Sequence, residues 1–310
     1  MPVPQDLLKQ LEELGPVRQH EPLARHVTFG VGGPADAYFV ARSRADLKAA
    51  FVAAAQAGVS CFVFGAGSNI LVGDAGIRGL VIENEAAEVD GPHPAEHDSL
   101  GLIRVDSGVS FAALARRMCR AGWGGVEWAV GIPGSLGGAV VHNAGAYDGA
   151  LSDVLVDALV VDESGNETTW PNDRLKFSYR NSVFTTGEIG RSVVLAVQLM
   201  LRRGEPDALM TTVAEYDKQR IDAQPPGRNC GSVFKNPAGR SSWELIDAVG
   251  LRGQRVGQAQ ISEKHANFFL NLGDARAADV KALIDMAQNR IREQFGIELE
   301  TEVNLVGEGF

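Results

Sequence analysis

The chain of 310 residues has 45% hydrophobic and 22% charged residues and a formal net charge of -10. This composition predicts a soluble globular protein of two or three domains and argues against a generic binder of nucleic-acid phosphates. An anionic substrate would need a local cluster of Arg and Lys.

No segment approaches the ~18–20 apolar residues that span a bilayer, and the N-terminus lacks the basic and apolar regions of a signal peptide. Three dispersed cysteines, Cys61, Cys119 and Cys230, predict neither a disulfide framework nor a zinc site and favour a reducing cytoplasm.

The first half of the chain shows helical and strand patterns in alternation. Leucines at helical spacing predict an amphipathic helix over residues 4–14. A strand is expected over 37–43, then a helix over 43–58 with Ser43 as N-cap, and a second strand over 60–69 that runs into a glycine-rich turn. Short strands follow at 79–84 and 102–108. This part is therefore expected to be a βαβ-like unit.

The second half mixes helices and strands irregularly. We expect helices at 110–125, 205–227, 241–250 and 277–295, and strands at 153–170 (two, joined by a Ser-Gly-Asn turn), 191–203, 267–272 and 297–307. The helix from 205 stops at Pro-Pro-Gly, and a domain boundary is expected near residue 204. The irregular alternation suggests an α+β or mixed α/β fold rather than a pure doubly wound sheet, and we expect the α+β class.

Glycine is the compositional outlier, with 36 residues where about 22 are expected from average usage. Many fall in three segments: loop I (28–35), loop II (64–76) and loop III (131–149). Glycine lets backbone N–H groups approach a ligand closely, and nests of such groups bind phosphate oxygens. Three such loops predict a cofactor that contains a pyrophosphate; the alternative is that these glycines only serve turns.

Two common nucleotide motifs do not account for these loops. Loop II contains Gly-Ala-Gly but lacks the third glycine of the Rossmann fingerprint, and the P-loop pattern is absent from the sequence. The predicted cofactor contacts are Gly30, Gly32 and Gly33 in loop I, Gly65, Ala66, Gly67, Ser68 and Asn69 in loop II, and Gly131, Ile132, Pro133, Gly134, Ser135, Gly137, Gly138, Asn143, Ala144 and Gly145 in loop III.

Five motifs together resemble one enzyme family. FGAGSNILVGD, residues 131–149, FSYRNSVF (177–184), CGSVFKNP and LETEVNLVG occur in the order found in UDP-N-acetylenolpyruvoylglucosamine reductases. The resemblance extends from about residue 28 to 307. It implies a vanillyl-alcohol-oxidase-type FAD-binding region over 1–204, in two lobes of about 1–75 and 76–204. It further implies a smaller α+β substrate-binding domain over 205–297 and a C-terminal strand, 298–310, that returns toward the active site.

The resemblance also implies a reaction and three catalytic residues. NADPH would reduce noncovalently bound FAD, and the reduced flavin would reduce UDP-N-acetylglucosamine enolpyruvate to UDP-N-acetylmuramate. The family's catalytic positions correspond to Arg180, Ser232 and Glu302. A guanidinium suits a substrate carboxylate because it is permanently charged and bidentate. Ser232 would protonate the enolate carbon, and Glu302 would polarise the enol or support Ser232 through water.

Two of these assignments have competitors nearby in the sequence. Cys230 would share a face with Ser232 in an extended segment, and an unperturbed thiol is the stronger acid, with a pKa of about 8.5. Glu298 and Glu300 would share a strand face with Glu302. Ser232 is preferred because the family pattern holds serine at that position, and Cys230 is expected to be a small buried hydrophobe.

The charge of the substrate needs local partners. The candidates are Tyr179, Arg228, Lys235, Asn236, Lys264 and His265, of which His265 alone would more often be a structural histidine. No His/Asp/Glu spacing resembles a metal site. All four tyrosines precede residue 217, which indicates the shorter form of the family without a tyrosine-bearing insertion. No obligate protein partner, nucleic acid or membrane is indicated.

Two other functions remain open at this level. Another flavoprotein of the same fold class, an alcohol or hydroxy-acid oxidase or dehydrogenase, would keep the glycine loops but need other residues at 180, 232 and 302. A nonenzymatic sugar-nucleotide binding protein would be colourless. Covalent flavin attachment through His26 or His142 is not expected, because the reductases hold flavin noncovalently.

Overall fold

The structure, a computed structural model, describes residues 3–95 and 99–310 and forms two compact units. Unit 1 contains residues 1–18, 37–66 and 79–220, and unit 2 contains 19–36, 67–78 and 221–310. The chain thus passes between the units several times, and loop II belongs to both.

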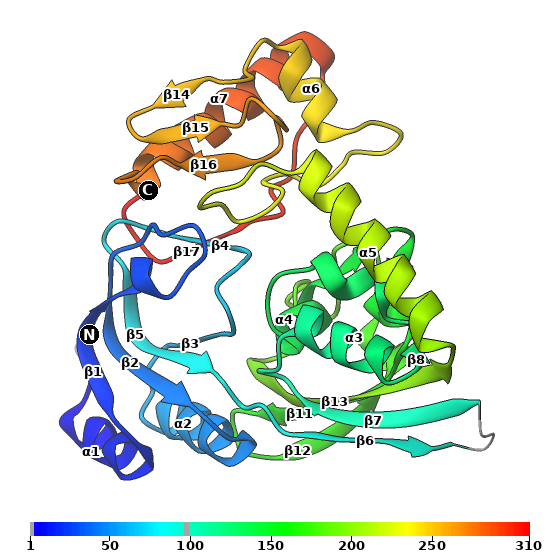
Figure 1. The fold of residues 1–310 in the computed structure, drawn as a ribbon. Helices are drawn as coiled ribbons and strands as arrows, with labels where there is room; N and C mark the ends of the chain where they lie inside the picture. The colour runs from blue at the N-terminus through cyan, green and yellow to red at the C-terminus, as the bar shows by residue number, and fades with distance from the viewer. Residues whose placement is uncertain (1–2, 96–98) are drawn as a thin grey trace. The chain divides into compact units, whose positions relative to one another are not determined.

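The larger part of unit 1 is an antiparallel sheet in the order β12-β11-β13-β7-β6, with β8 paired to β13 (Figure 1). Its strands are β6 (Val89–Pro94), β7 (Leu100–Asp106), β8 (Trp123–Gly124), β11 (Leu155–Asp162), β12 (Glu167–Pro171) and β13 (Ser192–Arg203). Helices α3 (Phe111–Arg120), α4 (Leu136–His142) and α5 (Pro206–Ala223) lie on one face of this sheet. The core between them contains Phe111, Trp128, Val197 and Leu199.

A second sheet has the order β1-β2-β5-β3, formed by β1 (Val17–Pro22), β2 (Pro34–Ala41), β3 (Cys61–Phe64) and β5 (Ile77–Asn84). Strands β3 and β5 are parallel and pair Phe64 with Glu83. Helices α1 (Gln5–Leu14) and α2 (Arg44–Gln56) bury Leu11 and Leu47 in the core of this part of unit 1. The Ser43 side chain accepts a hydrogen bond from the Asp46 amide, so the expected N-cap is confirmed.

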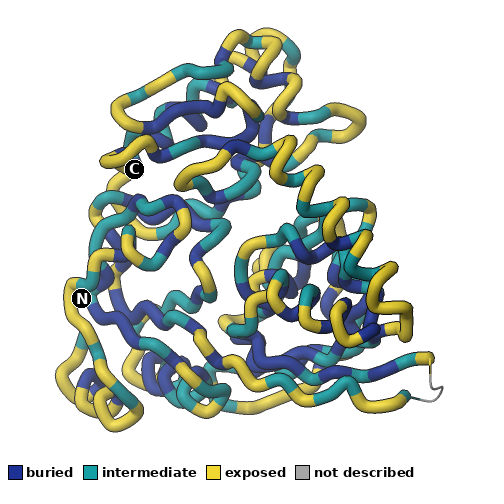
Figure 2. Tube along the Cα trace, in the orientation of Figure 1, coloured by how far each residue is buried: buried dark blue, intermediate teal, exposed yellow. Residues whose placement is uncertain are grey.

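Unit 2 contains a three-stranded antiparallel sheet covered by two helices (Figure 1). Its strands are β14 (Arg255–Val256), β15 (Ala259–Ile261) and β16 (Phe269–Asn271), and its helices are α6 (Ser242–Ala248) and α7 (Ala277–Phe295). Helix α7 buries an apolar side that includes Leu283 and Ile284. Figure 2 marks the buried residues along the chain in dark blue. Strand β4 (Ile70–Val72) pairs in parallel with β17 (Asn304–Val306) and carries loop II into this unit.

The remaining regular elements are short. Strands β9 (Gly145–Ala146) and β10 (Gly149–Ala150) form a hairpin within loop III. Single 3-10 turns occur at Leu23–Arg25, Glu127–Gly131, Leu151–Asp153 and Asn172–Leu175.

Among the described residues no helix is both long and apolar enough to cross a membrane. The same residues contain no group of three or more His, Cys, Asp or Glu side chains arranged to hold a metal.

The α+β class and the six expected helices are confirmed. Several short strands were not expected, and two further segments differ. Loop III contains helix α4, which was not expected because its first residues are rich in glycine. Its buried face is formed by Leu136, Ala139 and Val140. The last strand is shorter than expected, because residues 298–302 pair with no regular strand and form only an isolated Phe234–Thr301 bridge in the backbone. Alternating side chains therefore did not suffice to form a strand where no regular partner strand exists. The functional division at residue 204 stays a prediction.

The N-terminus of α7 is held by a carboxylate from loop II. Asp74 accepts hydrogen bonds from the amides of Ala277 (2.8 Å) and Ala278 (3.2 Å). These are two of the amides that a helix leaves without an internal partner. Asp74 therefore joins loop II to the longest helix of unit 2.

We expect Asp74→Ala to lower the free energy of unfolding of unit 2 by about 1–2 kcal/mol, because it removes a charged cap from α7. Asp74→Asn keeps one acceptor oxygen and is the matched control with a smaller loss. Hydrogen exchange of the α7 amides under native conditions measures the effect. Unchanged protection of these amides in Asp74→Ala would contradict the assigned role.

Candidate functional site

Loops II and III meet in unit 1 at a contact that admits no side chain on one of them. A Cβ at Gly65 would lie 2.1 Å from Ser135 Oγ and 2.5 Å from Ser135 Cβ. Any residue other than glycine at position 65 would therefore push the two turns apart. The contact joins residues 70 positions apart in the sequence, from the end of β3 and the start of α4.

The backbone at this contact carries free donors. The N–H groups of Gly65, Ala66, Gly134 and Ser135 donate to no acceptor within the part of the chain that the structure describes. Backbone N–H groups that lie near one contact and lack protein acceptors are suited to phosphate oxygens. The arrangement thus fits a pyrophosphate better than the alternative in which the glycines only serve turns.

Arg180 lies beside loop III, within the same unit. Its Nη2 donates to the Gly145 carbonyl oxygen at 2.7 Å, and its guanidinium lies 5.2 Å from the centre of the exposed Tyr179 ring. Asn143 Nδ2 donates to the Ser178 carbonyl oxygen and so ties the preceding residues to loop III. Arg180 has a φ of 53°, in the left-handed region that a bulky residue seldom adopts. Such strain is concentrated at functional positions.

Ser232 and Cys230 lie in unit 2 in different environments. Cys230 is buried, and burial, reinforced by the charge of Glu302, raises the pKa of its thiol to about 12. Ser232 is partly exposed, and its hydroxyl makes no hydrogen bond within residues 3–95 and 99–310. Between them Gly231 has a φ of 79°, which selects glycine there. The thiol is therefore a weaker acid than a free thiol and lies away from solvent, and the expectation that Cys230 is a buried hydrophobe agrees with its position.

Glu302 is hydrogen-bonded to the segment that carries Ser232, whereas the two other glutamates of its motif, Glu298 and Glu300, form ion pairs elsewhere. The Glu302 amide donates to the Val233 carbonyl at 2.8 Å, and the Glu302 carbonyl accepts from Asn69 Nδ2 of loop II at 3.0 Å. Glu298 forms an ion pair with Arg292, and Glu300 forms one with Lys235. Unit 2 thus brings Ser232, Glu302 and one end of loop II together.

The six candidates for substrate contacts differ in how they are engaged. Tyr179 is in unit 1, and the others are in unit 2. Lys235 pairs with Glu300, Asn236 Oδ1 accepts from the Ser242 amide, and Lys264 Nζ donates to the Ile221 carbonyl. These polar groups are thus partly used within the fold.

His265 and Arg228 differ from that group. Burial lowers the pKa of His265, whose Nδ1 accepts from the Asn267 amide and whose ring packs on Phe268, as in a structural histidine. Arg228 lies against loop I, where a Cβ at Gly30 would be 2.9 Å from Arg228 Cδ. Arg228 therefore combines a loop I contact with an exposed charge.

The other loop I and loop II glycines have packing reasons of their own. A Cβ at Gly33 would lie 2.2 Å from the Asp74 carbonyl oxygen, and one at Gly32 would lie 2.8 Å from Val72 Cβ. A Cβ at Gly67 would lie 2.7 Å from the His26 carbonyl oxygen, and the His26 ring is bound to Glu21. These contacts explain the absence of side chains there without a ligand.

Sequence reasoning missed a cation next to loop III. Arg220, on α5, packs on Gly131, where a Cβ would lie 2.8 Å from Arg220 Cδ. Burial lowers the pKa of this guanidinium, and Tyr147 and Asp217 are its nearest charge partners. Tyr147 stacks on Tyr216 of the same helix with ring centres 4.1 Å apart. No sequence motif contains Arg220. The only signal in the sequence is its spacing: it follows Tyr216 by four residues and Asp217 by three, so the three side chains lie on one face of α5.

Comparison with known proteins assigns the chain to a family. Residues 221–306 match the family model of the UDP-N-acetylenolpyruvoylglucosamine reductase C-terminal domain, and residues 35–169 match an FAD binding domain. The chain is 43% identical over 294 residues to the UDP-N-acetylenolpyruvoylglucosamine reductase of Syntrophotalea carbinolica, which covers 94% of this chain and 95% of that protein. It belongs to the UDP-N-acetylenolpyruvoylglucosamine reductase family.

Other family members agree. The reductase of Chloroflexus aggregans is 39% identical over 94% of this chain and 97% of its own length. The solved reductase of Thermus caldophilus has a TM-score of 0.77 and 34% identity, and covers 94% of this chain and 98% of that one. The protein is an FAD-dependent oxidoreductase with an FAD-binding domain, and the family resemblance of the motifs is confirmed. The individual catalytic, cofactor and substrate residues stay predictions.

The environment of Cys230 predicts an unreactive thiol. With a pKa of about 12, roughly one molecule in ten thousand carries the thiolate at pH 8. We expect no alkylation of Cys230 by iodoacetamide at pH 8 in the folded protein, and full alkylation after unfolding in guanidinium chloride. Mass spectrometry of the peptide that contains Cys230 measures both. Rapid labelling of the folded protein would show that the thiol is accessible and ionised, and would return it to consideration as the acid.

Proposed function

We propose that this protein reduces UDP-N-acetylglucosamine enolpyruvate to UDP-N-acetylmuramate with NADPH, as a cytoplasmic step of peptidoglycan precursor synthesis. One observation carries the proposal: 43% identity, over 94% of the chain, to a protein named UDP-N-acetylenolpyruvoylglucosamine reductase. The free hydroxyl of Ser232 and the location of Glu302 next to its segment support it.

The backbone of loops II and III would hold the cofactor. Their free N–H groups at Gly65, Ala66, Gly134 and Ser135 suit the pyrophosphate of FAD. When bound, FAD would supply the hydride chemistry between NADPH and the enolpyruvyl methylene carbon. Arg220 beside Gly131 adds positive charge at the same loop.

Arg180 would bind the carboxylate of the enolpyruvyl group. Its guanidinium is permanently charged and its fork matches a carboxylate. The bond from Nη2 to the Gly145 carbonyl fixes the side chain relative to loop III, so substrate and cofactor would be oriented by one structure. Positive charge here would also stabilise the enolate that develops after hydride addition.

Ser232 would donate its proton to the carbon next to the carboxylate and complete the saturated lactyl ether. An enolate beside a carboxylate is a strong base, which makes a hydroxyl an adequate acid. Glu302 would help to return a proton to Ser232 through water. Cys230 would serve only packing, since its thiol is buried whereas Ser232 is partly exposed.

The charge of the nucleotide would be met in unit 2. Arg228, Lys235, Asn236, Lys264 and His265 are the proposed contacts, with Tyr179 from unit 1. Arg228 is the strongest of these because it is exposed and lies against loop I. His265 is the weakest, because its ring is already packed and hydrogen-bonded within the fold.

The visible spectrum of the purified protein tests cofactor and reaction together. Under anaerobic conditions we expect NADPH to bleach the flavin band and UDP-N-acetylglucosamine enolpyruvate to restore it. UDP-N-acetylglucosamine without the enolpyruvyl group is the control and should leave the band bleached. A band that the enolpyruvyl substrate does not restore would favour another flavin dehydrogenase. A colourless protein that does not take up added FAD would contradict the enzyme assignment.

Substitution of the proposed acid separates the two half-reactions. We expect Ser232→Ala to leave reduction by NADPH within about twofold of the wild type and to slow reoxidation by the enolpyruvyl substrate by about 10²–10⁴-fold, the usual contribution of a general acid. Cys230→Ala is the matched control two residues away and should reoxidise at a near-normal rate. Stopped-flow absorbance follows both steps. The reverse pattern would identify Cys230 as the donor.

A further inference from the structure

The separation of the two glycine-rich turns in unit 1 depends on residues that belong to neither turn. Loop II leaves β3 after Phe64, which pairs with Glu83 of the parallel neighbour β5. Asn84 therefore ends β5 at the level where Gly65 begins loop II. The sheet register thus places Asn84 next to the start of loop II.

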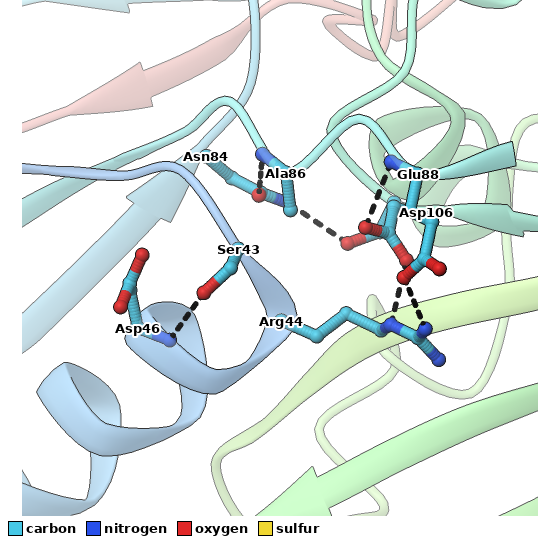
Figure 3. Close-up of polar contacts among 8 residues, drawn as sticks. Ser43, Arg44, Asp46, Asn84, Ala86, Glu88 and Asp106 are labelled. Atoms are coloured by element: carbon cyan, nitrogen blue, oxygen red, sulfur yellow. Dashed lines mark hydrogen bonds and ion pairs between the residues drawn. The ribbon is translucent and has the colours of Figure 1, made fainter.

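Asn84 is also linked to loop III through a buried serine. Its Nδ2 donates to Ser107 Oγ at 2.8 Å, and its Oδ1 accepts from the Ala86 amide at 3.1 Å (Figure 3 shows the Asn84–Ala86 contact). Ser107 has no exposed surface, and Asn84 is 6% exposed. A buried amide that lost its acceptor would bear the cost of desolvation, so the pair is strongly favoured as observed.

Ser107 contacts loop III directly. Its carbonyl accepts from the Gly137 amide at 2.7 Å, and a Cβ at Gly137 would lie 2.9 Å from Ser107 Cβ. Two more backbone bonds, from Phe111 to the Gly134 carbonyl and from Leu136 to the Val109 carbonyl, join the residues after Ser107 to loop III. Loop III therefore follows any shift of the turn that contains Ser107.

The other side of that turn is anchored by charge. Asp106 accepts from the Glu88 amide at 3.0 Å and pairs with Arg44 Nε at 2.8 Å (Figure 3). Gly108 allows close contact with the Asn84 segment, since a Cβ there would lie 2.5 Å from the Ala86 carbonyl oxygen. The Asn84–Ser107 hydrogen bond thus links the end of β5 to the turn after β7. That turn contacts loop III through Ser107, and it contacts Arg44 and Glu88 through Asp106.

We propose that Asn84 and Ser107 are positioning residues for the flavin site: their hydrogen bond sets the distance between loops II and III and thereby the fit of the pyrophosphate. This inference rests on the proposed placement of FAD between these loops, and not on the identity of the substrate. Neither residue reaches the cofactor in this scheme. Both act through Gly137, Ser135 and Gly65.

The test is a double-mutant cycle on affinity for FAD. We expect Asn84→Ala and Ser107→Ala each to raise the Kd for FAD about tenfold or more, measured by titration of the FAD-depleted protein with FAD by flavin fluorescence. The double variant should bind no more weakly than the weaker single variant, because both substitutions break one bond. Ser107→Cys keeps the size and a weak acceptor and should give an intermediate Kd, and it replaces either alanine variant that fails to fold.

A matched control separates positioning from general destabilisation. Asn172 Nδ2 donates to the carbonyls of Ser152 and Leu155, which belong to neither loop II nor loop III. Asn172→Ala should lower thermal stability while leaving the Kd for FAD within about twofold. Wild-type affinity in Asn84→Ala and Ser107→Ala, or fully additive losses in the double variant, would overturn the proposal. Since no substrate is used, failure of the proposed reduction would leave this result intact.

Discussion

The candidate cofactor site of unit 1 depends on the close contact between two glycine-rich turns. Gly65 and Ser135 approach so closely that a Cβ at position 65 would overlap the serine side chain. The approach leaves backbone N–H groups pointing to no protein acceptor in the described part of the chain. A rigid arrangement of amides suits phosphate because little order has to be gained on binding. The parallel pairing of β3 and β5, the turn after β7 and the N-terminus of α4 all position this contact.

The candidate catalytic residues are also linked to the glycine-rich loops by hydrogen bonds. Arg180 is tied to loop III through Gly145, so the group proposed to bind the carboxylate moves with the cofactor loop. Ser232 and Glu302 are joined through the Val233 carbonyl in the other unit, and Asn69 links that pair to loop II. Each candidate is therefore linked, directly or through a neighbour, by a side-chain hydrogen bond to a loop that the cofactor is proposed to contact. Such attachment favours a fixed geometry over a flexible one.

Burial distinguishes residues that the sequence leaves equivalent. Cys230 and Ser232 are two positions apart in a motif, and the thiol is intrinsically the stronger acid. Burial removes much of that advantage, since desolvation disfavours the thiolate, and it leaves Ser232 as the partly exposed group of the two. Similarly, Glu298 and Glu300 are exposed and ion-paired, whereas Glu302 joins the segment that carries Ser232. Local pattern alone contains no information about desolvation.

The sequence by itself determined the α+β class, the long helices, the glycine loops and the family, because these depend on local periodicity, turn chemistry and ordered motifs. Ser43 as N-cap and the helix from Ala277 followed from such local rules. Tertiary structure alone decided that Gly65 meets Ser135, that Asn84 bonds Ser107, that Arg220 packs on Gly131 and that residues 298–302 lack a strand partner. These contacts join residues far apart in the chain, and their energies come from packing and desolvation, which depend on the complete fold.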